Sequence, residues 1–371
     1  MKVCFIATTG SVHTRRWVNY LARNGHAVHL ISSRSSSGYD ERVRFHSLLR
    51  LFPGIWSISR YPSAALWPVQ LRRLLQWIKP DILHAHYITM NGHLAAASGF
   101  RPLVLTAWGS DILIEPQQSR VVRGLTRFAL RRADLITCDG DHLVQRLTEL
   151  GASATRIRIV YFGVDTETFK PKPRDRDLVA KLGFANSPIV ISLRSLKPLY
   201  DVESLVKAIP IVLRDIPDTK FIIAGEGEQR TYLENAASSF RGAVRFVGSL
   251  PELVLPSFLA SADVYVSTSL SDAGLSASTA EAMACGLPVI VTDFGDNRKW
   301  VEDGTNGFVV PLRNPRVLAA RIVSLLQSEP QRRRFGQINL QIAREKLSMG
   351  KEMGKMQHLY QELVDRYRSA E

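Results

Sequence analysis

The stretch SDAGLSASTAEAMACGLPVIVTD, residues 271–293, contains the strongest information on the fold of this chain. Its first residues are small or carry hydroxyl groups, and the run AEAMA that follows is a strong helix former. Gly286 and Pro288 end that helix, and VIVTD is typical of a buried strand. A loop of small residues that leads into a helix presents unpaired N–H groups at the positive end of the helix dipole, where anions bind. Glu281 follows one to two turns later and could accept hydrogen bonds from sugar hydroxyls, so phosphate beside ribose indicates a nucleotide.

Strand-like apolar runs alternate with helix-period segments on both sides of this stretch, which predicts an α/β protein with parallel sheets covered by helices. The Pro- and charge-rich segment KPKPRDRD, residues 170–177, separates two series of such runs. The expected strands are 2–8, 27–32, 81–87, 102–108, 134–140 and 157–163 before it, and 188–194, 220–227, 244–250, 263–269, 288–293 and 307–311 after it.

We therefore expect two Rossmann-like domains, residues 1–168 and 169–351, whose parallel sheets face a deep interdomain cleft. The charged helix near 352–371 is expected to pack back onto the first domain. A ligand is expected in the cleft, at the carboxyl ends of the strands.

Composition limits the location and the partners of the chain. No apolar run approaches the length of a membrane-spanning helix, and the N-terminus lacks the pattern of a secretory signal. The three cysteines, Cys4, Cys138 and Cys285, are widely spaced and indicate buried thiols in a reducing compartment. A cytoplasmic protein is expected.

The net charge of +14 is placed unevenly. Through residue 170 there are 22 Lys and Arg against 11 Asp and Glu, a net of +11, and the remainder has 26 against 23, a net of +3. This asymmetry favours an anionic partner for the first half, unless the surface is merely solvated. No nucleic-acid-binding motif is present, which leaves a membrane surface as the expected partner.

Six segments of the second half resemble the family 4 retaining glycosyltransferases of GT-B fold, in matching order and spacing. They are YFGVDTETFKP (161–171), FIIAGEGEQ (221–229), RFVGSLPE (245–252), SADVYVSTSLSDAG (261–274), AEAMACGLPVIVTD (280–293) and WVEDGTNGFVVP (300–311). The first half resembles the family more loosely, through residues 15–32, 81–87 and 105–111.

The resemblance implies transfer of a sugar from a nucleotide-diphosphate sugar, with UDP as the expected nucleotide, to a hydroxyl acceptor with retention of configuration. It places the donor mainly on the second domain and the acceptor on the first. A lipid-linked or cell-envelope glycan acceptor is expected. The donor is a substrate, so no cofactor is implied.

The resemblance also implies the catalytic residues. Glu281 is expected to bind the ribose, and Arg194 and Lys197 to neutralise the diphosphate as it leaves. The usual arginine-to-lysine spacing is five residues, whereas these two are three apart and Tyr200 stands near the expected lysine. The further donor-binding residues are Gly10, Ser11, Gly225, Gly227, Gly248, Ser249, Gly274, Leu275, Ser276, Ala277 and Ser278.

Two positions depart from the family pattern. The first of two glutamates eight positions apart is replaced by Ala273, beside which Asp272 could accept a hydroxyl of the donor sugar. The alternative is that Asp272 caps a turn. A histidine before the glycine of the GSD turn is replaced by Trp108, which cannot shuttle a proton but could stack on a sugar or shape the acceptor pocket.

Candidate acceptor-binding residues are His13, His86, Trp108 and Asp111. His13 follows Gly10 and Ser11 in the first strand-to-helix turn, where glycine permits a close approach of substrate. His84 and His86 lie on one face of a strand, and His84 is expected to be structural. Asp111 could orient a substrate, act as a general base or cap a helix.

The run DGD, residues 139–141, resembles a metal-binding DxD but directly precedes a helical pattern. Asp139 or Asp141 is therefore expected to cap that helix, and metal-independent transfer is expected.

Residues 48–80 interleave tryptophans with arginines, a pattern that suits the headgroup region of an anionic membrane. Peripheral docking at the inner face of the cell membrane is expected, the alternative being a helix with Trp67 and Trp77 in the core. Two other functions remain open, a non-catalytic nucleotide-sugar-binding protein and an epimerase or phosphorylase on the same fold.

Overall fold

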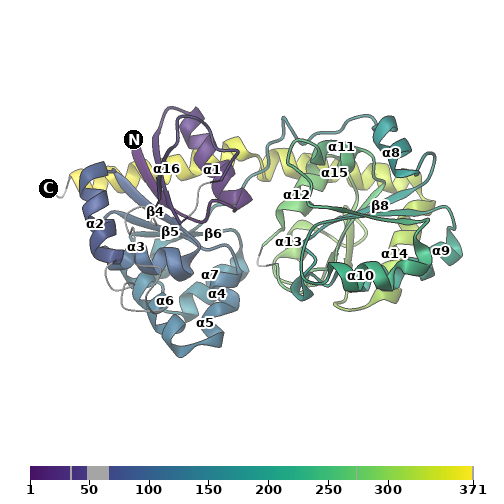
Figure 1. Ribbon diagram of the computed structural model, residues 1–371, viewed down its shortest axis with the longest axis horizontal. Coiled ribbons are helices and arrows are strands. Elements are labelled where there is room, and N and C mark those ends of the chain that lie inside the picture. The colour runs from purple at the N-terminus through teal and green to yellow at the C-terminus, as the bar shows by residue number, and fades with distance from the viewer. Residues whose placement is uncertain (34–35, 48–66, 273, 370–371) are drawn as a thin grey trace. The chain divides into compact units, whose positions relative to one another are not determined.

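The computed structural model describes residues 1–33, 36–47, 67–272 and 274–369. The chain forms two compact units, Met1–Phe162 together with Lys351–Glu371, and Gly163–Gly350. Each unit is built around one parallel sheet with helices on its faces, as Figure 1 shows. The expected α/β class is confirmed.

The first unit contains a seven-stranded parallel sheet in the order β3-β2-β1-β4-β5-β6-β7. Its strands are β1 (Lys2–Ile6), β2 (Ala27–Ser32), β3 (Arg44–Ser47), β4 (Ile82–His86), β5 (Leu103–Thr106), β6 (Leu135–Cys138) and β7 (Ile157–Ile159). The central strands are buried on both faces, which explains runs such as VCFI and LVLT that do not alternate with polar residues.

The helices of the first unit connect successive strands. They are α1 (Val12–Arg23), α2 (Trp67–Ile78), α3 (His93–Ala97), α4 (Ser110–Leu113), α5 (Glu115–Gln118), α6 (Arg120–Arg132) and α7 (Asp141–Glu149). A short π-helical turn, η3 (Ile88–Gly92), precedes α3. Trp17 and Leu21 form part of the buried stripe of α1, and the Ser11 side chain caps its first turn by accepting from the N–H of Thr14.

The helix α16 (Met349–Arg368), yellow in Figure 1, returns to the first unit from the end of the chain. Tyr360 of α16 is buried, and its hydroxyl forms a 2.5 Å hydrogen bond with His84 Nδ1. The carboxylate of Glu352 accepts from the N–H of Tyr161. Residues far apart in sequence therefore share one core.

The second unit contains a six-stranded parallel sheet in the order β10-β9-β8-β11-β12-β13. Its strands are β8 (Ile189–Leu193), β9 (Lys220–Ala224), β10 (Val244–Gly248), β11 (Val264–Ser267), β12 (Val289–Thr292) and β13 (Gly307–Val310). Its helices are α8 (Arg176–Leu182), α9 (Val202–Asp215), α10 (Arg230–Ala236), α11 (Leu255–Ala260), α12 (Ala277–Ala284), α13 (Asn297–Trp300), α14 (Pro315–Gln327) and α15 (Glu329–Lys346). The core joins Val190 and Ile290 of the sheet to Ile209 of α9 and Ile322 of α14.

The expected strands all form, but the unit boundary differs from the expected one. The first unit ends at Phe162 rather than at residue 168, and its C-terminal segment begins at Lys351. The reason is local pairing, because Val164 forms a β-bridge with Ser348 and its N–H donates to the carbonyl of Leu347. The edge strand β3 is an addition that the apolar pattern of RFHS did not indicate.

One local expectation and one alternative are corrected by the structure. Gly140, not Asp139 or Asp141, occupies the N-cap of α7, and Asp141 is the first helical residue, where its charge favours the helix dipole. The alternative that Trp67 and Trp77 lie in the core is wrong for Trp77, which is 72% exposed, while Trp67 is partly buried at the start of α2. Residues 48–66, the larger part of the expected membrane-docking stretch, and Ala273 lie outside the described residues.

Candidate functional site

The helix α12 begins at the residue expected from the sequence. Ser276 is its N-cap in extended conformation, and its side chain accepts from the N–H of Thr279 at 3.3 Å. Gly274 and Leu275 are buried before it, and Ala277 and Ser278 form its first turn. The structure therefore presents the N-terminus of an eight-residue helix beside the carboxyl end of β11.

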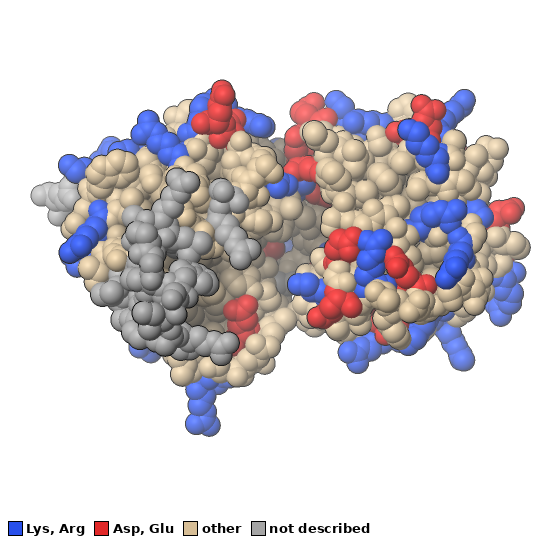
Figure 2. Space-filling model, in the orientation of Figure 1, with Lys and Arg blue, Asp and Glu red and all other residues tan. Residues whose placement is uncertain are grey.

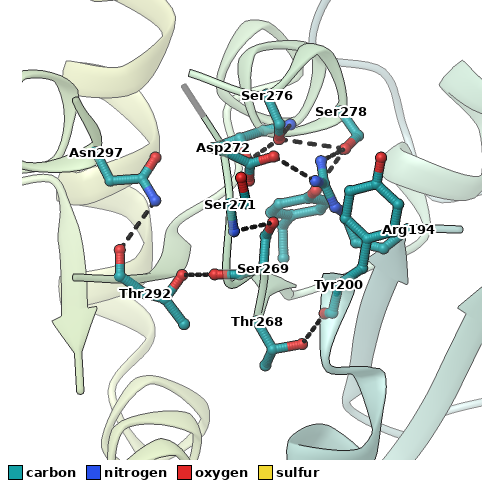
Figure 3. Close-up of polar contacts among 12 residues, drawn as sticks. Arg194, Tyr200, Thr268, Ser269, Ser271, Asp272, Ser276, Ser278, Thr292 and Asn297 are labelled. Carbon is teal, nitrogen blue, oxygen red and sulfur yellow. Dashed lines mark hydrogen bonds and ion pairs between the residues drawn. The ribbon is translucent and has the colours of Figure 1, made fainter. Parts of the chain in front are cut away.

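Arg194 lies directly after β8 and reaches this helix (Figure 3). Its Nη2 donates to Asp272 Oδ1 at 2.5 Å, and its Nη1 lies 3.4 Å from Ser278 Oγ. The Arg194 and Asp272 side chains are only 8% and 11% exposed. Their charges therefore meet with little solvent screening, and the pair holds the loop before α12 against the end of β8.

The guanidinium of Arg194 remains charged despite its burial. Burial lowers its pKa, but the carboxylate of Asp272 and the nearby Tyr265 and Tyr200 outweigh this effect, so the pKa is raised above its ordinary value. Its Nε is buried with no hydrogen-bond partner among the described residues. A buried, charged donor without an acceptor indicates a place for an anionic ligand.

Two tyrosines complete this cluster. The Tyr200 ring lies 4.5 Å from the guanidinium carbon of Arg194, and the buried Tyr265 hydroxyl donates to Ser278 Oγ at 2.7 Å. Lys197 is exposed in the loop after β8 and lies outside the network. Tyr265 is not among the site residues expected from the sequence, although alternation in VYVS places it on the strand face opposite Val264 and Val266, which belong to the core.

The loop that precedes α12 is held by a chain of side chain to backbone bonds, drawn in Figure 3. Thr268 Oγ1 donates to the carbonyl of Tyr200, and Thr292 Oγ1 donates to the carbonyl of Ser269. Asn297 Nδ2 donates in turn to the carbonyl of Thr292. These bonds connect the ends of β11 and β12, so the segment from which Asp272 extends is held in place.

The glycines expected at the donor site permit close backbone contact. Gly225 has φ +145°, and a Cβ there would lie 2.1 Å from the carbonyl oxygen of Arg194. A Cβ at Gly227 would lie 2.2 Å from the carbonyl of Leu196. The N–H of Gly225 donates to the carbonyl of Gly248, and Ser249 follows in an exposed position. The three glycines thus bring the ends of β8, β9 and β10 together.

Glu281 is 4% exposed on α12. It lies three residues after Ser278 and therefore on the same helix face. Burial, together with the smaller effect of the Glu281 charge, raises the pKa of the neighbouring Cys285 thiol to about 12. The Cys285 thiol is thus protonated and inert, as expected from the sequence.

In the first unit, three expected acceptor residues form one cluster of rings. His13 stacks on Trp108 with centroids 4.7 Å apart and planes inclined by 16°, and His86 meets Trp108 edge-on at 5.3 Å. His13 Nδ1, His86 Nε2 and Trp108 Nε1 are buried and have no hydrogen-bond partner among the described residues. One face of Trp108 is thus occupied by His13.

The imidazoles of this cluster are neutral. Burial lowers the pKa of His13 to about 4, helped by the charge of Arg16, and lowers that of His86 to about 3. His84 has the expected structural role, because its two ring nitrogens bond to Tyr360 and Thr106 and its pKa is lowered well below its ordinary value by burial. His84 and His86 lie on one face, with ring centroids 4.6 Å apart.

Asp111 organises the loops around these rings. Its Oδ2 accepts from the N–H of Ile88, and its Oδ1 accepts from those of Trp108 and Gly109. Gly109 rather than Asp111 is the N-cap of α4. Burial raises the pKa of Asp111 to about 6 against the lowering effect of the three N–H donors. Both oxygens are occupied, so its position suits an orienting role better than that of a base.

Gly10 and Ser11 lie in the turn between β1 and α1, in the first unit. Ser11 is the N-cap of α1, and a Cβ at Gly10 would meet nothing within 4 Å. The structure thus brings Arg194, Asp272, Ser276 and Ser278 together in one unit and His13, His86, Trp108 and Asp111 in the other.

The described part of the chain contains no group of three or more His, Cys, Asp or Glu residues that could hold a metal ion. None of its helices combines the length and apolar character needed to cross a bilayer.

Two family models match the sequence. One, described as glycosyl transferases group 1, matches residues 175–341, and the other, described as glycosyl transferase 4-like, matches residues 2–140.

Two curated relatives show similar degrees of identity. The chain is 29% identical to spore coat protein SA of Bacillus subtilis over 220 residues, 55% of this chain and 58% of the relative. It is also 29% identical over 258 residues to the GDP-mannose-dependent alpha-(1-6)-phosphatidylinositol monomannoside mannosyltransferase of Mycolicibacterium smegmatis, 66% of each chain. The matches thus span less than two thirds of these relatives' own lengths.

Among solved structures, HepE of Anabaena in complex with UDP superposes with a TM-score of 0.80, covering 98% of this chain and 100% of that one at 18% identity. At this identity the likeness concerns the fold.

Proposed function

The chain belongs to the group 1 glycosyl transferases, and on that premise we propose that it moves a sugar from a nucleotide-diphosphate sugar to a hydroxyl acceptor with retention of configuration. The fold is the GT-B fold that the sequence predicted, with two parallel sheets and their helices. Relatives of this family use nucleotide-sugar donors, as the name of the mycobacterial relative states.

The Arg194 cluster is the observation that carries this proposal. The guanidinium is buried, charged and bonded to Asp272, and its Nε has no acceptor among the residues of the described chain. A diphosphate would supply that acceptor, and the positive end of α12 lies next to it. Both groups would stabilise the negative charge that grows on the diphosphate as the sugar leaves.

Asp272 holds Arg194 in place in this proposal and is available to accept a hydroxyl of the donor sugar. Glu281, on the same face of α12 as Ser278, would accept hydrogen bonds from the ribose. The acceptor hydroxyl would attack from the side of the leaving diphosphate, and the diphosphate would take its proton.

The ring cluster of His13, His86 and Trp108 is the proposed acceptor site. Three unsatisfied ring nitrogens in one place could bind acceptor hydroxyls, with the neutral imidazoles serving as donor or acceptor according to tautomer. A lipid-linked acceptor is supported by the name of the mycobacterial relative, which acts on a phosphatidylinositol mannoside. UDP is the proposed nucleotide, supported by the UDP complex of the Anabaena neighbour.

Metal-independent transfer is part of the proposal, because Arg194 and α12 would neutralise the diphosphate. Activity should persist in excess chelator. Activity that disappears with chelator and returns with Mn²⁺ or Mg²⁺ would contradict it.

The test of the function is donor hydrolysis and transfer by the whole chain and its variants. Arg194→Ala and Glu281→Ala should each lower kcat/KM by about 10²–10³-fold, the scale for loss of a charge-stabilising group. Arg214→Ala removes an exposed arginine of the same unit and should leave kcat/KM unchanged. Equal turnover by all three variants would contradict the assignment.

A second candidate function is a non-catalytic nucleotide-sugar-binding protein. Trp108 favours it, since an indole stacked on His13 cannot carry a proton to or from a substrate. Donor binding in a thermal-shift screen without hydrolysis or transfer to any acceptor would support this candidate.

A further inference from the structure

The helix α6 (Arg120–Arg132) exposes a stripe of apolar side chains. Val121, Leu125 and Phe128 are 70%, 45% and 43% exposed. Because an α-helix turns by roughly 100° per residue, these three positions fall within an arc of about 60°. The stripe is thus continuous along two turns of the helix.

Three exposed arginines border this stripe on one side, and a fourth, Arg132, is exposed within its arc at the end of the helix. The helix contains five arginines and no acidic residue. Arg120, Arg127 and Arg131 are exposed and fall within an arc of about 40° beside the apolar one. Arg123 instead donates to the carbonyl of Pro116. The exposed face therefore combines apolar and cationic groups, and the long arginine stems can extend toward the plane of the stripe.

The stripe belongs to a firmly packed helix. The opposite face of α6 buries Thr126, Ala129 and Leu130, and the helix packs against α3, α5 and η3. Ser119 caps its first turn by accepting from the N–H of Val122. One face of α6 is thus buried in the core, and the apolar stripe and its arginines lie on the exposed face.

We propose that this face of α6 docks the first unit onto an anionic lipid surface. Val121, Leu125 and Phe128 would enter the boundary between headgroups and acyl chains, while Arg120, Arg127 and Arg131 pair with lipid phosphates. Lipid binding itself does not require catalysis. The inference rests on the proposed function only for the purpose of docking, which is to bring the enzyme to a lipid-linked acceptor.

Charge and composition favour a lipid surface over two other occupants. A nucleic acid would pair with the arginines but would leave Leu125 and Phe128 in water. A second copy meeting the same face would bring two sets of arginines together without a carboxylate between them. On the face of the molecule drawn in Figure 2, Lys and Arg predominate over Asp and Glu on the first unit, whereas both signs intermingle on the second.

The test is sedimentation of the full chain with vesicles of phosphatidylcholine containing or lacking phosphatidylglycerol. The protein should pellet with the anionic vesicles alone, and less as salt is raised, since screening weakens the arginine contribution. The double variant L125S/F128S should bind about tenfold more weakly. R127Q/R131Q should lose about fivefold for each arginine removed.

Matched controls lie on the second unit. L253S removes an apolar side chain that is 90% exposed there, and R176Q/R316Q removes two exposed arginines. Both should bind vesicles like the unchanged chain. Far-UV circular dichroism and thermal unfolding of L125S/F128S verify that it is folded.

Three outcomes would overturn the proposal. One is the absence of binding to anionic vesicles. Another is equal binding by L125S/F128S and the unchanged chain, which would place lipid contact elsewhere, for example on residues 48–80. The third is a dimer in light scattering, or RNA binding, that L125S/F128S abolishes while vesicle binding is absent. Because no donor or acceptor is present, failure here is separate from failure of the proposed transfer.

Discussion

At the scale of single residues, the proposed donor site depends on how one guanidinium is held. Arg194 touches a carboxylate, a hydroxyl and an aromatic face, which come from Asp272, Ser278 and Tyr200. Its position is therefore determined by contacts from three segments. A lysine could not make these contacts together, because it lacks the planar fork of donors.

Tyr265 supports this arrangement through Ser278. Tyr265→Phe keeps the buried ring but removes the hydrogen bond to Ser278 Oγ. We expect the donor KM to rise or kcat to fall by up to about tenfold, which corresponds to the loss of one buried hydrogen bond. Tyr360→Phe removes a buried hydroxyl in the other unit and is the matched control. If both variants lose stability alike and neither changes the kinetics, Tyr265 is only structural.

The residues of the proposed donor site were expected on two different grounds. Ser276 follows from a loop of small residues that leads into a helix, whereas Arg194 and Asp272 follow from the resemblance to the glycosyltransferase family. Lys197 was expected beside Arg194, yet the turn after β8 places Tyr200 against the guanidinium instead. The stacking of His13 on Trp108 joins residues about 95 positions apart and depends on packing that no local pattern expresses.

At the scale of elements, regular structure was the easiest to predict. Central parallel strands are buried on both faces and appear as unbroken apolar runs, so every central strand could be located. β3 could not, since RFHS has a single large apolar residue, Phe45, and that residue is 38% exposed. An edge strand takes its register from its neighbour β2 rather than from its own pattern.

The cap of α12 allows helix stability to be separated from ligand binding. Ser276→Ala removes the side-chain acceptor for the N–H of Thr279 and should cost about 1 kcal/mol, a shift in Tm of about 2–4 °C. It should also weaken donor binding, because the turn that loses its cap is the turn whose N–H groups would bind the diphosphate. Calorimetry and donor titration measure the two effects.

Ser328→Ala is the matched control for this prediction. Ser328 caps α15 by accepting from the N–H of Gln331 at 3.4 Å, as Ser276 caps α12. Ser328→Ala should lower Tm by a similar amount and leave donor affinity unchanged. A loss of donor affinity in both variants would show that the effect of Ser276→Ala is one of stability.

At the scale of the whole molecule, the two units differ in their response to acid. All nine histidines lie in the first unit and none in residues 163–350. Burial lowers the pKa of His13, His84 and His86 below that of an unfolded histidine. The folded state therefore stays unprotonated where the unfolded state binds protons, so the stability these groups confer is present above pH 6.5 and is lost as the pH falls toward 4.

The expected result is selective loosening of the first unit in mild acid. Each of these histidines lowers the free energy of unfolding by about 1.4 kcal/mol for every pH unit below 6.5. Asp111, with a pKa raised to about 6, opposes them with one carboxyl group, because its protonation favours the folded state. Hydrogen exchange at pH 7 and pH 5, corrected for the intrinsic rate, should show protection lost from peptides of residues 1–162 and retained in 189–350.

A uniform loss of protection across both units would contradict this prediction. His86→Gln offers a further check, since a glutamine side chain can still bond to Thr14 Oγ1 but does not titrate. In that variant, protection from hydrogen exchange should fall less steeply with pH in the first unit and should be unchanged in the second.

The return of α16 to the first unit also affects the order in which the chain folds during synthesis. Residues 163–350 form one continuous segment, whereas the first unit still needs Tyr360 and its neighbours after that segment has been made. At the usual pace of a ribosome, roughly 10–40 s separate residue 162 from residue 371. During that interval the face of the first sheet that α16 covers is open, so the N-terminal half is the part of the nascent chain that requires a chaperone's protection.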